Sequence, residues 1–160
     1  MATTRVPGTT GATGTAPRGI DPRGPRFAAG ITAVVLAVAV LTGSVWVLAF
    51  QTLVFGIGYA APAASPYGWL YRTLVRPRLG PPAELEDPAP PRFAQAVGLG
   101  FAVVGLAGFL LGADLLGLVA TGFALVAALL NAVFGFCLGC EMYLLIKRLT
   151  GPRVVPVRAD

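Results

Sequence analysis

The chain has 160 residues, of which 56% are hydrophobic and 12% are charged, and its net charge is +5. Soluble domains carry about 25% charged residues, so this composition excludes most soluble enzymes and indicates an integral membrane protein. The sequence lacks histidine and has two cysteines, so we expect neither hydrolytic chemistry nor a bound metal or other cofactor, and we relate the basic residues to membrane orientation rather than to nucleic acid.

The N-terminal third contains a polar tail and a long apolar block. Residues 1–24 have almost no large apolar side chains, which predicts a disordered cytoplasmic tail. The following uncharged block would form a helix of about 54 Å, whereas the hydrocarbon core is about 30 Å thick. Its one turn-like cluster is Thr42-Gly43-Ser44, so we expect helices over 27–42 and 45–62. One strongly tilted helix is the alternative.

Residues 63–92 are predicted to leave the membrane. A run of tyrosine, tryptophan and arginine predicts an interfacial helix at about 65–77, because aromatic side chains favour the headgroup region and arginine can snorkel from it. The proline-rich and acidic residues 81–91 predict an exposed loop, which is either a solvated linker or a docking site for a partner.

The second apolar block carries one charge, Asp114. Gly112-Ala113-Asp114 divides this block into predicted spans over 93–111 and 115–136. At such a turn Asp114 can stay in water, whereas at a helix centre it would cost about 2.5–3.5 kcal/mol. The expected fold is thus all-α, with four transmembrane helices in two hairpins and a membrane domain over 25–150.

The basic residues predict the orientation of these four spans. All twelve fall in the tails (to 24 and from 151), beside the first and fourth spans, or between the second and third spans, and neither hairpin turn carries one. The positive-inside rule therefore predicts a multi-pass protein of the cell membrane with both termini in the cytoplasm.

Two pairs of short matches suggest an internal repeat. Pro25-Arg26-Phe27-Ala28 matches Pro91-Arg92-Phe93-Ala94, and Val54-Phe55-Gly56-Ile57 resembles Val133-Phe134-Gly135-Phe136. Chance is the alternative in a chain so rich in Ala, Val, Gly and Leu. If a duplication produced them, the two hairpins are parallel repeats related by an axis along the membrane normal.

The two cysteines, Cys137 and Cys140, are three residues apart near the end of the last apolar segment. A helix over 115–149 would be about 52 Å long, so it cannot lie wholly in the bilayer. We expect the chain to leave the membrane near Gly135 and Gly139. Both cysteines would then lie at the cytoplasmic boundary, at the end of the fourth helix or the start of an interfacial segment.

The spacing of Cys137 and Cys140 suits dithiol chemistry. On a helix they would share one face with Cα atoms about 5 Å apart, within the range of a disulfide. A new helix starting there would favour a thiolate, and the adjacent Glu141 would oppose one. Because the cytoplasm is reducing, we expect a cycling pair rather than a standing disulfide. Inert packing, or a metal site shared in a homo-oligomer, are the alternatives.

A few uncharged polar residues fall inside the predicted spans, chiefly Gln51 and Asn131, with Thr121 a weaker case. We expect them to hydrogen-bond between helices, each contributing about 0.6 kcal/mol. The alternative is a polar lining for a small solute near the dithiol. Asn131 and Cys137 lie about 120° apart on an ideal helix, so they need not share a pocket.

The run from Gly135 to Tyr143 and the run Ser65-Pro66-Tyr67-Gly68 resemble a bacterial, largely actinobacterial, family of four-helix membrane proteins with a C-terminal Cys-x-x-Cys, catalogued as a domain of unknown function. The resemblance covers about residues 24–150. Genes of that family often neighbour thioredoxin-like or rhodanese-type sulfurtransferase genes. The resemblance therefore implies a membrane partner in thiol redox or sulfur metabolism, and only Cys137 and Cys140 correspond to candidate functional residues.

The sequence leads to two functional hypotheses. In the first, a cytoplasm-facing dithiol of Cys137 and Cys140 exchanges electrons or sulfane sulfur with a soluble thioredoxin-like or rhodanese-type partner. In the second, the protein is a non-enzymatic membrane scaffold or small-solute channel whose cysteines pack or regulate. The sequence does not decide whether the protein is an enzyme.

Overall fold

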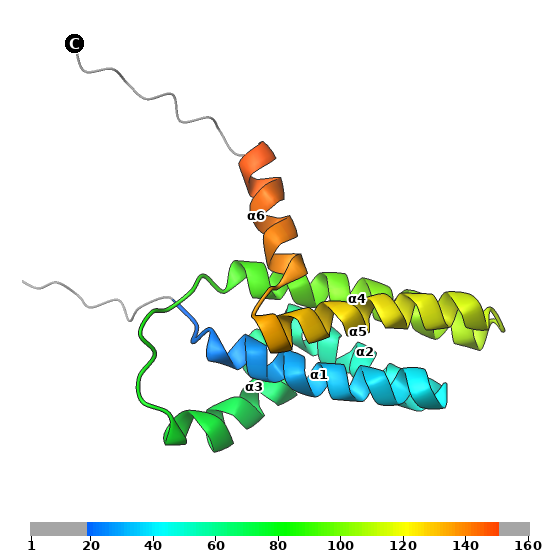
Figure 1. Ribbon diagram of the computed structural model, residues 1–160, viewed down its shortest axis with the longest axis horizontal. Helices are drawn as coiled ribbons and strands as arrows, with labels where there is room; N and C mark the ends of the chain where they lie inside the picture. The colour runs from blue at the N-terminus through cyan, green and yellow to red at the C-terminus, as the bar shows by residue number, and fades with distance from the viewer. Residues whose placement is uncertain (1–18, 151–160) are drawn as a thin grey trace, which may run out of the picture.

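A computed structural model describes residues 19–150 of the chain, which are all-α (Figure 1). Residues 1–18 of the predicted N-terminal tail and the predicted tail at 151–160 lie outside the described residues. The elements are α1 (Arg23–Thr42), α2 (Val45–Ala60), a 3-10 turn (Pro62–Ala64), α3 (Pro66–Leu70) with a π turn (Tyr71–Val75) and a 3-10 turn (Arg76–Arg78), α4 (Ala89–Leu110), α5 (Asp114–Phe134) and α6 (Leu138–Thr150).

The four longest helices (α1, α2, α4 and α5) lie at the positions of the four predicted spans, with shifted ends. α1 begins at Arg23 and α4 at Ala89, each about four residues before the predicted start. Prolines occupy the first turns of both helices, where no backbone N–H is needed for the helical ladder, so they do not delay the start. α2 and α5 each end two residues before their predicted ends, at Ala60 and Phe134.

Both predicted hairpin turns are confirmed. Gly43 and Gly112 adopt left-handed φ angles of 62° and 74°, a conformation that glycine adopts without steric cost. The hydroxyl oxygen of Ser44 then accepts a hydrogen bond from the Val47 N–H and caps α2. Asp114 is the first residue of α5 and is exposed, where a carboxylate interacts favourably with the helix dipole.

The four long helices form a ring, in which each helix packs against two others rather than only against its neighbour in sequence. α1 packs against α2 and α5, and α4 packs against α2 and α5. All four neighbouring pairs are antiparallel (Figure 1). A two-fold axis along the bundle that exchanges the α1–α2 and α4–α5 hairpins would produce this order. The tandem repeat itself stays a prediction.

The packing reverses the usual distribution of side-chain size. Most buried residues on the facing sides of the helices are small, and most large apolar side chains on the long helices are exposed. That distribution suits a bundle whose outer surface contacts lipid. α1, α4 and α5 are long and apolar enough to cross a membrane, and α2 is a shorter apolar helix. The chain is therefore an α-helical protein of the membrane class.

The half of the bundle near the hairpin turns is closed by glycine contacts between α4 and α5. A Cβ atom on Gly108 would lie 2.6 Å from the backbone nitrogen of Gly117, and one on Gly105 would lie 2.6 Å from Oγ1 of Thr121. Thr121 is buried and donates its hydroxyl proton to the Gly117 carbonyl at 2.8 Å. The small residues thus bring the two backbones together.

The predicted interfacial segment at 65–77 is helical, because α3 and its two turns cover Pro66–Arg78. Its tyrosines do not lie in the headgroup position that the sequence predicts. Tyr67 and Tyr71 are buried against the bundle, and the Tyr67 hydroxyl donates to Oε1 of the fully buried Gln51 at 2.9 Å. The exposed aromatic residue of this segment is Trp69.

Candidate functional site

The site begins where α5 ends. Gly135 has a φ of 70°, its N–H donates to the Asn131 carbonyl at 3.0 Å, and the Phe136 N–H donates to the Leu130 carbonyl at 3.3 Å. These two bonds form the usual glycine-terminated helix end. A Cβ on Gly135 would lie 3.1 Å from Cζ of Arg26, so the guanidinium of α1 covers this turn. The chain then turns sharply into α6 (Figure 1).

Cys137 and Cys140 form a disulfide at the start of α6, with Cα atoms 5.2 Å apart, close to the distance that the spacing predicts. Cys137 directly precedes the helix, and its carbonyl accepts the Glu141 N–H at 3.0 Å. Its Sγ accepts the Cys140 N–H at 3.3 Å. Both cysteines are partly buried. Of the two predicted positions for the pair, the structure has the start of a new helix.

α6 is attached to α4 beside the disulfide. A Cβ on Gly139 would lie 2.6 Å from Cα of Ala94, so the two helices are nearly in backbone contact. One turn further, the rings of Phe93 and Tyr143 lie 5.8 Å apart, and Nζ of Lys147 lies 5.9 Å from the Tyr143 ring centroid. These contacts hold the Cys-x-x-Cys segment across the end of the bundle.

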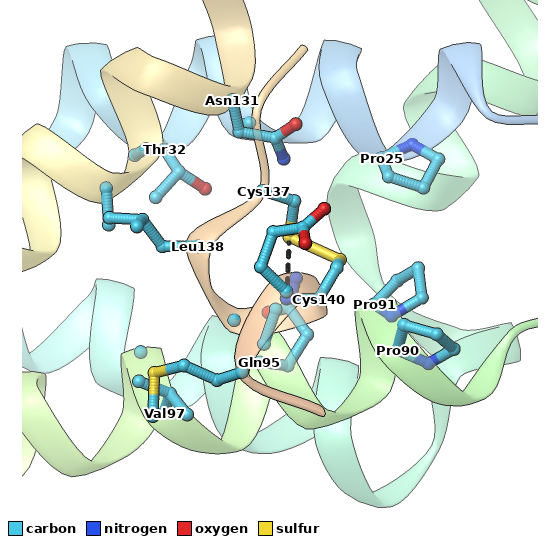
Figure 2. Close-up of a pocket in the computed structure, with 18 of the residues that line it drawn as sticks. Pro25, Thr32, Pro90, Pro91, Gln95, Val97, Asn131, Cys137, Leu138 and Cys140 are labelled. Atoms are coloured by element: carbon cyan, nitrogen blue, oxygen red, sulfur yellow. Dashed lines mark hydrogen bonds between the residues drawn. A yellow bond between two sulfur atoms is a disulfide. The ribbon is translucent and has the colours of Figure 1, made fainter. Parts of the chain in front are cut away.

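A cavity of about 650 Å³ lies beneath the disulfide and is lined by both cysteines. Its other polar lining side chains include Thr32 of α1, Gln95 of α4 and Asn131 of α5 (Figure 2). Its lining residues on α4 extend to Phe101 and on α5 to Phe123, about halfway along each helix. They do not reach the glycine contacts of the other half, so the cavity does not extend through the bundle.

The polar residues predicted within the spans take different positions. Asn131 lines the cavity together with Cys137, although an ideal helix would place them about 120° apart. The helix break at Gly135 brings them together. Gln51 and Thr121 are buried elsewhere in hydrogen bonds, Gln51 with Tyr67 and Thr121 with its own helix, and neither lines the cavity.

Sequence reasoning missed Thr32, Gln95 and Arg26 as lining residues. Thr32 is buried, and Gln95 lies so close to α2 that a Cβ on Gly58 would be 2.8 Å from its Oε1. Gln95 is an uncharged polar residue in an otherwise apolar run, which is the signal that could have identified it. Arg26 belongs to α1, far from the cysteines in sequence, and only the contact of α1 with α5 brings it to the site.

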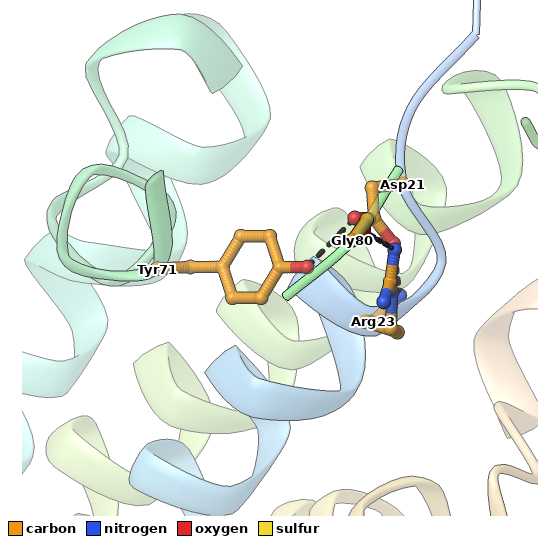
Figure 3. A network of polar contacts seen from close by, with 4 residues as sticks. All are labelled: Asp21, Arg23, Tyr71 and Gly80. Atoms are coloured by element: carbon orange, nitrogen blue, oxygen red, sulfur yellow. Dashed lines mark hydrogen bonds and ion pairs between the residues drawn. The ribbon is translucent and has the colours of Figure 1, made fainter. Parts of the chain in front are cut away.

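A second polar cluster lies at the same end of the bundle (Figure 3). Asp21 accepts hydrogen bonds from the Arg23 side chain at 3.0 Å and the Tyr71 hydroxyl at 2.7 Å, and Arg23 also donates to the Gly80 carbonyl at 3.0 Å. Ile20 and Glu86 exchange two backbone hydrogen bonds of 2.9 Å. The predicted exposed loop is therefore tied to the residues before α1.

Burial and the hydrogen bonds of this cluster shift the pKa values of Asp21 and Tyr71. Burial tends to raise the pKa of Asp21, but the hydrogen bonds from Arg23 and Tyr71 outweigh it and hold that pKa below its usual value. Burial, together with the bond to the Asp21 carboxylate, raises the pKa of Tyr71. The phenol therefore stays protonated as the donor. Within residues 19–150, the structure has no group of three or more His, Cys, Asp or Glu side chains placed to hold a metal ion.

Comparison with known families identifies the chain. The family model described as "Domain of unknown function (DUF4395)" matches residues 20–148, a span that includes both cysteines and most of the described helices. Neither the curated proteins nor the solved structures include a match to it. The match confirms one part of the resemblance, a domain of unknown function that contains the C-terminal Cys-x-x-Cys, and the chain therefore belongs to the family of the domain of unknown function DUF4395.

Proposed function

We propose that Cys137 and Cys140 form a thiol–disulfide exchange centre at the cytoplasmic surface of the cell membrane. It would exchange electrons or sulfane sulfur with a soluble thioredoxin-like or rhodanese-type partner. The observation that supports the proposal most is the position of the pair, since the disulfide lies at the N-terminal end of α6 with an N–H directed at the Cys137 sulfur.

The helix start assigns a chemical role to each cysteine. When the pair is reduced, the free N–H groups of the first turn of α6 stabilise negative charge on Cys137. We therefore assign the attack to the Cys137 thiolate. It attacks one sulfur of a partner disulfide and forms a mixed disulfide, and the other sulfur of that partner disulfide leaves as a thiolate while the partner stays bound. The Cys140 thiolate then attacks Sγ of Cys137, which closes the internal disulfide and releases the reduced partner.

The cytoplasmic orientation rests on charge. The eight basic residues of the described chain all lie at the disulfide end of the bundle or in the segments attached to it, and the hairpin turns carry the carboxylate of Asp114. The positive-inside rule favours this end for the cytoplasm. A pair that cycles between dithiol and disulfide is compatible with that reducing compartment.

Trapping of the mixed disulfide tests this function. The full chain, reconstituted in liposomes and reduced, is mixed with a soluble thioredoxin whose resolving cysteine is replaced by serine. The remaining thioredoxin cysteine is supplied as its mixed disulfide with thionitrobenzoate, so that an attacking thiolate displaces thionitrobenzoate and forms the protein–protein disulfide. We expect Cys140→Ser to accumulate a mixed disulfide through Cys137, and Cys137→Ser to accumulate much less, as resolved on a non-reducing gel. A rhodanese carrying a persulfide is tested in parallel, with labelled sulfur transferred to Cys137 as the expected result. If neither protein forms an adduct with either single-cysteine variant, the proposed function is wrong.

A further inference from the structure

We propose that the cavity beneath the disulfide binds a membrane quinone, which oxidises the Cys137–Cys140 dithiol. This inference rests on the proposed function, in which the pair cycles between dithiol and disulfide. It adds the redox co-substrate and the route by which that co-substrate arrives. The thiol–disulfide exchange then runs in its reverse direction: a reduced partner dithiol reopens the Cys137–Cys140 disulfide, so that electrons pass from the soluble partner to the cysteine pair and from the pair to the quinone.

The size and lining of the cavity fit such a ligand. Its volume of about 650 Å³ lies within the usual range of small-molecule pockets, about 300–1,000 Å³. Most of its lining is apolar and includes the rings of Phe55, Phe101 and Phe123. Flat aromatic side chains can pack against the faces of a quinone ring.

The cavity also reaches the lipid-facing surface. Phe101 and Phe123 line it from the middle of α4 and α5, their rings lie 6.0 Å apart, and they are 39% and 61% exposed. In a bundle that crosses the membrane, side chains exposed at that level contact acyl chains. A ligand with a long apolar tail can therefore enter from the bilayer and keep its tail there while its head lies under the disulfide.

The polar groups are placed at the end of the cavity where a quinone head would lie. Asn131, Gln95 and Thr32 carry amide or hydroxyl donors and line the cavity with both cysteines (Figure 2). Arg26 lines the same end and lies over Gly135. The two carbonyl oxygens of a quinone accept hydrogen bonds from such donors. The acyl chain of a lipid would offer these donors no hydrogen-bond acceptor.

The stoichiometry of the two redox couples also agrees, because a dithiol and a quinone each exchange two electrons and two protons. The Cys137 thiolate adds to a ring carbon. The Cys140 thiolate then attacks Sγ of Cys137, so that the S–S bond forms and the C–S bond breaks. The electron pair of that C–S bond remains on the ring. The two protons lost by the thiols end on the two ring oxygens, and the products are one disulfide and one quinol.

The test uses the full chain in nanodiscs, reduced and freed of reductant under anaerobic conditions, with short-tailed ubiquinone and short-tailed menaquinone as probes. We expect one disulfide to form for each quinol produced, and no reaction in the Cys137→Ser/Cys140→Ser variant. Ala127 lines the cavity, and Ala127→Phe should fill it and slow oxidation by about 100-fold through misplacement of the ring. Val126→Phe, on the exposed neighbouring position outside the lining, is the matched control and should react as the native chain does.

The thioredoxin trapping assay separates the two proposals. Ala127→Phe combined with Cys140→Ser should form the mixed disulfide with thioredoxin as Cys140→Ser alone does, which also shows that the variant is folded. If trapping works but neither quinone oxidises the dithiol, or if Ala127→Phe and Val126→Phe react alike, the quinone proposal is wrong and the exchange function stands. If cavity-dependent oxidation occurs without trapping, the quinone proposal stands and the soluble partner is wrong.

Discussion

Gly139 and Ala94 are packed with no room for a side chain between them, since a Cβ on Gly139 would lie 2.6 Å from Cα and 2.7 Å from Cβ of Ala94. Gly139 is also the second residue between the two cysteines. The orientation of the disulfide is thus fixed by a glycine contact with α4, the helix that carries Gln95.

Replacing Gly139 should loosen this end of the bundle. Gly139→Ala forces α6 away from α4 and should lower the free energy of unfolding by about 1–3 kcal/mol, as overpacked sites do. It should also speed alkylation of the reduced cysteines by a maleimide. Leu138→Ala is the control, because Leu138 is exposed and lies in the same dipeptide. Equal melting temperatures and equal alkylation rates for the two variants would contradict the role of this contact.

The contact of Gly108 with Gly117 should be as sensitive in the other half of the bundle. Gly108→Ala would place a methyl group against the Gly117 backbone, so we expect a lower melting temperature in detergent and a loss of about 1–3 kcal/mol. The matched control is Gly100→Ala on the same helix, where a Cβ meets nothing within 4 Å. There the substitution should be neutral or slightly stabilising, because alanine is the better helix former. A similar loss in both variants would show that this contact does not determine the packing.

The hydrogen bond between Tyr67 and Gln51 predicts that removing one polar group lowers the stability more than removing both. Gln51 is fully buried, and its Nε2 has no hydrogen-bond partner among the described residues. Tyr67→Phe would leave Oε1 of Gln51 without a partner as well, so we expect the free energy of unfolding to fall by about 1 kcal/mol. The double variant Tyr67→Phe/Gln51→Leu removes both polar groups and should recover part of that loss. A double variant less stable than Tyr67→Phe would contradict this account.

The lowered pKa of Asp21 predicts a pH-dependent anchor for the loop before α4. A carboxyl whose pKa is lower in the folded state stabilises that state above its unfolded value of about 3.9, and this contribution is lost as the pH falls through the lowered pKa. Asp21→Asn should therefore melt below the native protein at pH 7, and the difference should begin to shrink as the pH falls to the unfolded value and disappear below the lowered pKa. Thermal unfolding followed from pH 7 into this acidic range measures it, and a difference that does not shrink as the pH falls would exclude the carboxylate as its source.

Labelling with an impermeant thiol reagent tests the proposed orientation. In a background without native cysteines, Thr42→Cys and Ala113→Cys near the hairpin turns should be labelled from outside intact cells. Leu85→Cys, in the loop at the basic end, should be labelled only after the membrane is opened. Protection of both turn positions would remove the arrangement with cytoplasmic termini.

Much of this fold follows from local sequence. Gly43 and Gly112 mark the hairpin turns, because each lies in a short turn-like cluster within an apolar block. The break near Gly135 follows from length, because the last apolar segment is too long to lie wholly in the bilayer. The position of Asn131 beside Cys137 could not be predicted, since it depends on the direction that the chain takes after Gly135.

Contacts between distant segments also lie beyond sequence patterns. Tyrosine is typical of the headgroup region, so the sequence suggests that position for Tyr67. Only the packing of α3 on the bundle shows that its hydroxyl donates a hydrogen bond to Gln51. The pairing of Ile20 with Glu86 joins residues that are far apart and carry no motif. The cavity is formed by four helices and the start of a fifth, so no single stretch of sequence encodes it.

The ring order of the helices has a consequence for how the protein is made. Leu36 and Leu48, from the first hairpin, belong to one buried cluster with Ala102 and Ala124 from the second. When the first hairpin enters the bilayer during synthesis, α4 and α5 do not yet exist, so its inner face has lipid as its neighbour. Insertion and assembly must therefore be separate stages, and the disulfide end is completed last, when α5 docks on α1 and α6 follows it.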